Sequence, residues 1–248
     1  MISALVFEWR RMWSIRSTWI MLISYLGSIG FFGVFPLFSA REPGMQSWIG
    51  LYNTSYNFFS LVLLSVIGAQ VFGHEYRYGT IRLTLTEFPK REIVMIAKSL
   101  ILLFFVTFSV LLSWGLLGFL AQFAPEGTLS SDAVGFTFSP NPPADLWKVL
   151  LFIVGYLFIA MSVVTITRNL ALGIVIPLLM STILESLLGI LNQFAKQKFD
   201  WITTRLPFDN ANDWLGDGGL YETPGLTFAA WVVGLYLIAS VMFFKRDA

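Results

Sequence analysis

Long apolar stretches with almost no charged residues are the feature of this sequence that most limits its fold. A charged side chain at the centre of a bilayer costs roughly 2.5–3.5 kcal/mol on insertion scales, and about 20 apolar residues are needed to cross the hydrocarbon core. The pattern predicts six membrane-spanning helices, at residues 17–38, 52–72, 99–124, 147–167, 169–188 and 226–244.

The composition excludes several classes of protein. Only 12% of the 248 residues are charged, whereas soluble domains usually carry about a quarter, and 56% are hydrophobic. The net charge of +1 gives no basic excess for binding nucleic acid. The chain has no cysteine and one histidine, His74, which removes disulfides, zinc clusters and cysteine nucleophiles. We expect an all-α integral membrane protein with a single transmembrane domain, no catalytic residue and no metal site.

The distribution of cations predicts the orientation. Four segments (the N-terminus, the second-to-third connection, the fourth-to-fifth turn and the C-terminus) hold 11 of the 16 Lys and Arg but 5 of the 15 acids. Cations accumulate on the cytoplasmic side of membrane proteins. We therefore expect both termini in the cytoplasm, as an even number of spans also requires.

The fifth span is the least regular of the six. Only Arg168 and Asn169 separate it from the fourth, which predicts a tight hairpin. Gly173 and Pro177 are able to kink or break a helix. The apolar segment Ser186–Ala195 either continues this span or folds back as a separate short helix.

Residues 1–16 have the pattern of an amphipathic helix in the headgroup plane. Arg10 and Arg11 lie opposite the apolar side and are expected to face phosphate. The helix either only anchors the first span or acts as an elbow that slides during a transport cycle. The apolar residues fall within an arc of about 120°: Ile2, Leu5, Val6, Trp9, Met12 and Trp13.

Residues 74–98 form the long cytoplasmic connection. Gly79 and Thr80 suggest a turn, with Thr80 capping exposed amide groups of a helix. The period of the following residues is ambiguous between a strand and a short helix. Ile81, Leu83, Leu85 and Phe88 are expected to be exposed and to dock onto lipid or a soluble partner.

The predicted extracellular loop, residues 189–225, is acidic. Asp209, Asp213 and Asp217 are spaced by four residues. Calcium loops of the EF-hand type need oxygen ligands at alternate positions, with a glycine and a closing glutamate. The stretch does not match, so we expect these acids to be solvated.

The connection resembles the signature of type-2 ABC transporter permeases. The resemblance is carried by the spacing Glu75-x3-Gly79-Thr80-x2-Leu83-x-Leu85-x3-Pro89-x-Arg91-x6-Lys98. It extends to the N-terminal elbow, the fourth-to-fifth hairpin and a Leu206-Pro207-Phe208 marker before the last span. Thr84 departs from the family, where many members have the second leucine of a Leu-Leu pair.

The resemblance implies a coupling helix in this connection that sits in a groove of a cytoplasmic ATPase. It also implies short extracellular helices around residues 185–195 that re-enter the outer leaflet. The implied ATPase-coupling residues are Glu75, Tyr78, Gly79, Thr80, Ile81, Leu83, Leu85, Pro89, Arg91 and Lys98.

The leading hypothesis is therefore the permease subunit of an ATP-driven exporter in a bacterial cell membrane. No GxxxxGK[ST] loop is present, so ATP and Mg are expected on a separate ABC ATPase subunit, with no cofactor in this chain. Six helices make half a pathway, so a second copy or a related permease is the expected partner, along with membrane lipid. The aromatic bundle slightly favours an amphipathic or hydrophobic substrate, such as an antimicrobial peptide or drug.

Two other classes of protein fit the sequence less well. An ion-coupled secondary transporter typically has internal repeats, paired broken helices and mid-membrane ionisable residues. This chain offers one kinked helix and Glu185 at the edge of a span. An intramembrane hydrolase lacks candidates, because His74 is expected on the cytoplasmic side.

Overall fold

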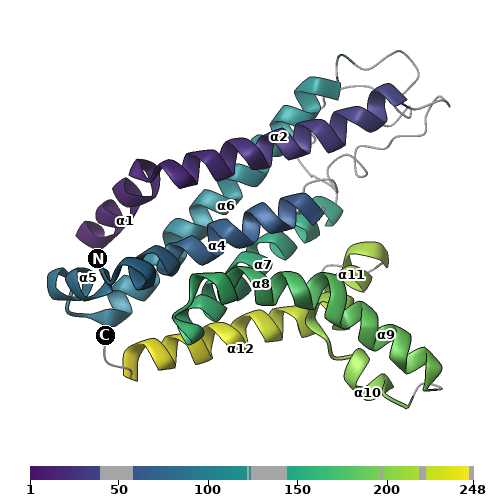
Figure 1. Ribbon diagram of the computed structural model, residues 1–248. Coiled ribbons are helices and arrows are strands. Elements are labelled where there is room, and N and C mark those ends of the chain that lie inside the picture. The colour runs from purple at the N-terminus through teal and green to yellow at the C-terminus, as the bar shows by residue number, and fades with distance from the viewer. Residues whose placement is uncertain (40–57, 122, 124–143, 196–197, 218–221, 246–248) are drawn as a thin grey trace.

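A computed structural model describes the chain except for residues 40–57, 122, 124–143, 196–197, 218–221 and 246–248. All its regular elements in the described residues are helices, which confirms the all-α prediction (Figure 1). They are α1 (Ile2–Ser14), α2 (Arg16–Ser39), α4 (Phe58–Tyr78), α5 (Ile81–Glu87), α6 (Arg91–Ala121), α7 (Ala144–Thr167), α8 (Leu170–Leu179), the π-helical turn η3 (Met180–Leu184), α9 (Glu185–Phe194), α10 (Asp200–Thr203), α11 (Pro207–Asp217) and α12 (Thr223–Lys245).

Five stretches in the described residues are long and apolar enough to cross a membrane. They are Phe59–Tyr78, Arg91–Leu120, Trp147–Thr167, Leu170–Phe194 and Thr223–Lys245. A sixth is reached only when α1 and α2 are counted as one span, and these two helices are bent by 66°. The chain is thus a multi-pass membrane protein, while the sixth span stays a prediction.

Helix α7 is the centre of the bundle and packs against α4, α8 and α12. Its buried residues include Ile153, Tyr156, Leu157 and Ala160, at helical spacing. The predicted hairpin between the fourth and fifth spans is present as a turn of two residues. Asn169 accepts hydrogen bonds from the backbone N–H groups of Ala171 (2.9 Å) and Leu172 (3.4 Å) and so caps α8.

The helix that contains the predicted third span, 99–124, begins before that span. Helix α6 starts at Arg91, so Lys98 lies inside this helix and not in a loop. The two starts differ for a physical reason: a charge limits how deep a residue sits in lipid, but it does not prevent a helix. Helix α4 likewise continues to Tyr78, beyond the predicted end of the second span at residue 72. Residues 52–57 of that span lie outside the described part.

The fifth span does not fold back at residue 185. Helix α8, turn η3 and α9 follow one another without a break from Leu170 to Phe194. Pro177 lacks an amide hydrogen and distorts the hydrogen-bond ladder, and the wider turn η3 begins at Met180, in the next turn of the helix. Residues 185–194 therefore continue the fifth helix, and the short helices that follow are α10 and α11. Re-entry of these helices into the outer leaflet stays a prediction. It is α11 that packs back against the bundle, on α7 and α12.

Candidate functional site

A single glycine creates the corner between α4 and α5. Gly79 has φ +66°, a left-handed conformation that side-chain-bearing residues rarely adopt. The chain turns there and begins the short helix α5, so the ambiguous period of the sequence resolves as a helix. Thr80 does not cap α5 with its side chain, contrary to expectation. Its carbonyl oxygen instead accepts the backbone N–H of Thr84 at 3.1 Å.

Helix α5 has one face on the protein and one face free. Ile81 is buried, and Leu85 and Phe88 pack against the core, so the prediction that these three are exposed is wrong. Their spacing of four and three residues places them on one side of a helix, which the alternating pattern obscured. Leu83 is 70% exposed and Tyr78 is 64% exposed. These two are the large apolar side chains that the corner presents outward.

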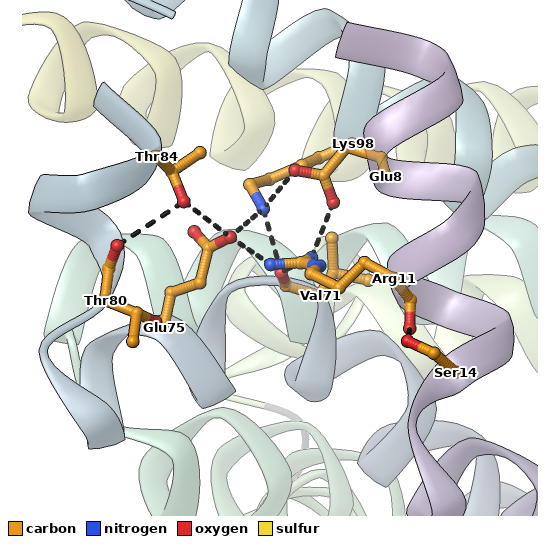
Figure 2. A network of polar contacts seen from close by, with 8 residues as sticks. All are labelled: Glu8, Arg11, Ser14, Val71, Glu75, Thr80, Thr84 and Lys98. Carbon is orange, nitrogen blue, oxygen red and sulfur yellow. Dashed lines mark hydrogen bonds and ion pairs between the residues drawn. The ribbon is translucent and has the colours of Figure 1, made fainter. Parts of the chain in front are cut away.

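A cluster of four charged side chains lies behind α5 (Figure 2). Glu75 comes from α4, Lys98 from α6, and Glu8 and Arg11 from α1. The Nζ atom of Lys98 lies 2.7 Å from Oε1 of Glu75 and 2.8 Å from Oε1 of Glu8. Arg11 pairs with Glu8 at 2.7 Å and also with Glu75. Two cations thus neutralise two anions, and we call these residues the charge cluster.

Two uncharged groups form hydrogen bonds with the charge cluster. The carbonyl oxygen of Val71 accepts hydrogen bonds from Arg11 (2.8 Å) and from Lys98 (3.4 Å). The hydroxyl of Thr84 donates to Oε1 of Glu75 at 3.3 Å, which ties α5 to the cluster (Figure 2). A leucine at position 84 is unable to make this bond, so the threonine has a structural role at this position.

The charge cluster is deeply buried. Lys98 is 0% exposed, Glu8 is 2% exposed and Glu75 is 3% exposed. Burying an ion costs several kcal/mol, and removing one partner of a buried pair costs about 3–5 kcal/mol, since it leaves an uncompensated charge. Helices α1, α4, α5 and α6 are therefore held in one arrangement by charges whose separation is expensive.

Sequence reasoning missed half of this cluster. Arg11 was expected to face lipid phosphate, but it points inward to Glu8 and Glu75. Glu8 received no role, although it is the only acid in a helix that also carries Arg10 and Arg11. The face of α1 on the bundle is Ala4, Glu8 and Met12. Because this narrow stripe contains a charged residue, a search for an apolar arc does not find it. A single acid on an amphipathic helix is a signal that could have identified the buried face.

The other predicted coupling residues are spread around the same end of the bundle. Pro89 lies in the short connection between α5 and α6. The guanidinium of Arg91 donates to the carbonyl oxygen of Phe243 at 3.2 Å and so binds the last turn of α12. The structure brings Glu75 and Lys98 together with α5, whereas Arg91 serves a separate contact.

A second buried carboxylate lies toward the other end of the molecule. Glu185, 1% exposed, accepts the backbone N–H groups of Phe208 (3.2 Å) and Asp209 (2.5 Å). These belong to the first turn of α11, whose first residue is Pro207. Free N–H groups and the positive end of the helix dipole stabilise an anion at this place. The burial of Phe208 against Tyr156 of α7, with ring centroids 5.5 Å apart, completes the attachment of α11 to the bundle.

Comparison of the chain with models of known protein families and with curated proteins found no match.

Proposed function

We propose that this chain is the permease subunit of an ATP-driven exporter and forms half of the translocation pathway. In this proposal a separate ABC ATPase subunit binds ATP and Mg, and a second permease subunit completes the path. The observation that carries the proposal is the construction of α5: its outer face is free, and its inner face is fixed to the charge cluster that joins α1, α4 and α6.

The free face of α5 has the composition of a protein interface. Leu83 and Tyr78 supply exposed apolar surface, and Arg82 and Thr86 near them are exposed and polar. An apolar centre with a polar rim is typical of an interface between two proteins. A helix of seven residues is too short to be stable alone, so its attachment to the bundle is what gives a partner something rigid to push.

The charge cluster offers a route for that push. Movement of α5 displaces Thr84, whose hydroxyl is bonded to Glu75. Glu75 is paired with Lys98 of α6 and Arg11 of α1, so these helices follow, because separating buried charges is costly. Binding of ATP to the partner then biases the bundle between two states through a difference in contact free energy.

We further propose a bacterial cell membrane with both termini in the cytoplasm. Its support is that the cation-rich segments share one end of the bundle. The start of α1 and the end of α12 lie near α5 in Figure 1. Arg91 binds the end of α12, and the guanidinium of Arg168 in the α7–α8 turn lies 6.0 Å from the ring centroid of Tyr76.

Labelling of single cysteines tests this orientation, because the chain has no cysteine of its own. We expect Asp213→Cys in α11 to react with an impermeant reagent from outside intact cells, and Arg82→Cys in α5 to react only after the cells are opened. Both side chains are exposed. The reverse pattern contradicts the proposed topology.

Docking is tested by co-purification with candidate ABC ATPase subunits. We expect Leu83→Arg to abolish stable association and the stimulation of ATP hydrolysis, because a charge replaces the apolar centre of the interface. Glu92→Arg is the matched control, since Glu92 is exposed at the start of α6 and outside α5. Equal ATPase association for both variants and the unmodified chain contradicts the proposed coupling role.

The alternative, an ion-coupled secondary transporter, is favoured by one observation: Glu185 is a buried carboxylate within a candidate span. Both of its oxygens accept backbone N–H groups, which favours a structural role. Transport by the purified chain, driven by an ion gradient without any ATPase, decides for this alternative.

A further inference from the structure

An open groove of about 630 Å³ runs along α1 and ends at the last residue of α5. Its α1 wall includes Ser3, Val6, Phe7 and Arg10, and its other wall includes Glu87. None of these α1 residues belongs to the stripe that faces the bundle, which is Ala4, Glu8 and Met12. Only Val6 among them belongs to the apolar arc. The rings of Phe7 and Phe88 are 5.7 Å apart, so the residue after Glu87 is held directly against α1.

The groove contains one free cation and one free anion. Arg11 also lines it but is paired with Glu8 and Glu75. Among the described residues, Arg10 and Glu87 have no ion-pair partner and do not pair with each other. Both are exposed. Phe7 contacts Phe88, the residue that follows α5, and Arg10 lies about one helical turn farther along α1. Arg10 is therefore close to the end of α5. A ligand of matching chemistry therefore carries a negative and a positive group close together.

A group of tryptophans places this part of α1 at the level of lipid headgroups. The rings of Trp9 and Trp13 are 5.4 Å apart, and those of Trp13 and Trp19 are 4.9 Å apart. Trp9 also packs on Phe104 of α6 at 5.1 Å. Tryptophan concentrates at the boundary between hydrocarbon and water, so the groove on the neighbouring side of α1 is within reach of headgroups.

We propose that this groove binds the headgroup of a phospholipid that carries a primary ammonium, of the phosphatidylethanolamine type. The guanidinium of Arg10 holds the phosphate, which its planar fork matches, and the carboxylate of Glu87 accepts the ammonium N–H groups. Val6 and Phe7 contact the apolar part of the lipid. A purely anionic headgroup leaves Glu87 facing a like charge, and a quaternary ammonium has no N–H to donate. The proposal does not depend on transport or on an ATPase.

Native mass spectrometry of the full chain in detergent tests the lipid class. We add phosphatidylethanolamine, its N-methyl and N,N-dimethyl forms, phosphatidylcholine and phosphatidylglycerol, all with the same acyl chains. We expect phosphatidylethanolamine to bind roughly tenfold more tightly than phosphatidylcholine, since a charge-assisted hydrogen bond is lost, with the methylated forms between them. Equal binding of all five lipids overturns the proposal, as does the tightest binding by phosphatidylglycerol.

Variants assign the two charges. We expect Glu87→Gln to remove the preference for phosphatidylethanolamine over phosphatidylcholine, and Glu92→Gln, a matched exposed control, to keep it. Arg10→Gln should weaken all five lipids alike, whereas Arg82→Gln on exposed α5 surface should not. A preference that survives in Glu87→Gln overturns the assignment of the ammonium site. Binding of the lipid series to the unmodified chain stays decisive even if a variant does not fold.

One more arm separates a lipid from a free solute of the same headgroup chemistry. Phosphorylethanolamine, added without acyl chains, should compete only weakly, because it makes no contact with Val6 and Phe7. Competition as strong as that of the intact lipid overturns the lipid assignment and identifies a soluble ligand instead.

Discussion

The two ends of this bundle bury carboxylates in different ways. At the α5 end, Glu75 and Glu8 are neutralised by Lys98 and Arg11, whose side chains come from different helices. Toward the α11 end, Glu185 is satisfied by two backbone N–H groups. The first arrangement consists of four side chains that substitutions can exchange, whereas half of the second belongs to the backbone. The α5 end is thus held by ion pairs between side chains, and the α11 end by backbone N–H groups at the start of a helix.

Removing one cation gives the largest expected effect on this contrast. Lys98→Met should lower the free energy of unfolding by about 3–5 kcal/mol, since Glu8 and Glu75 then share Arg11 alone. Denaturation followed in detergent measures this, and Lys90→Met is the exposed control.

A second substitution tests whether the loss comes from charge imbalance. Glu8→Gln combined with Lys98→Met leaves Arg11 and Glu75 as a neutral pair, so the double variant should recover at least about 1 kcal/mol relative to additivity. Strict additivity of the two changes contradicts the described cluster.

Substitutions of Glu185 should lower the free energy of unfolding by an amount that depends on how many acceptor oxygens remain. A compensating change of charge elsewhere should not restore the lost stability. Glu185→Leu leaves two buried N–H groups without an acceptor and should cost about 2–3 kcal/mol, while Glu185→Gln keeps one acceptor oxygen and should cost roughly half of that. Proteolysis within α11 measures its release. If both variants protect α11 as well as the unmodified chain does, its attachment does not depend on this carboxylate.

The smallest effect is expected at Thr84, where the charge cluster meets α5. Thr84→Val keeps the shape but removes the hydroxyl bonded to Glu75, and should lower the free energy of unfolding by about 1 kcal/mol. Thr86→Val is the control, because its hydroxyl bonds only to carbonyl oxygens within α5. A larger loss at Thr86 than at Thr84 argues that the cluster does not include α5.

The membrane-spanning helices were largely predictable because lipid imposes a composition on each of them separately. The hairpin at Arg168 and Asn169 followed from the length of its two neighbours. The charge cluster was not predictable in the same way, since Lys98 looks like any cation that flanks a span, and only the packing of α1 on α6 shows that Glu8 is its partner. Likewise, Leu206-Pro207-Phe208 was visible as a motif, but its link to Glu185 depends on α11 returning to the bundle.

The π-helical turn η3 determines where Glu185 points. Such a turn contains one residue more than an α-helical turn, so every side chain after Leu184 is rotated by about 100° from its place in an uninterrupted α-helix. The side chains of α9 are therefore offset around the helix from the positions that a continued α8 would give them, although the two helices follow one another without a break. Rewinding η3 into α-helical form would turn the carboxylate of Glu185 away from the N–H groups of Phe208 and Asp209, and so would detach α11.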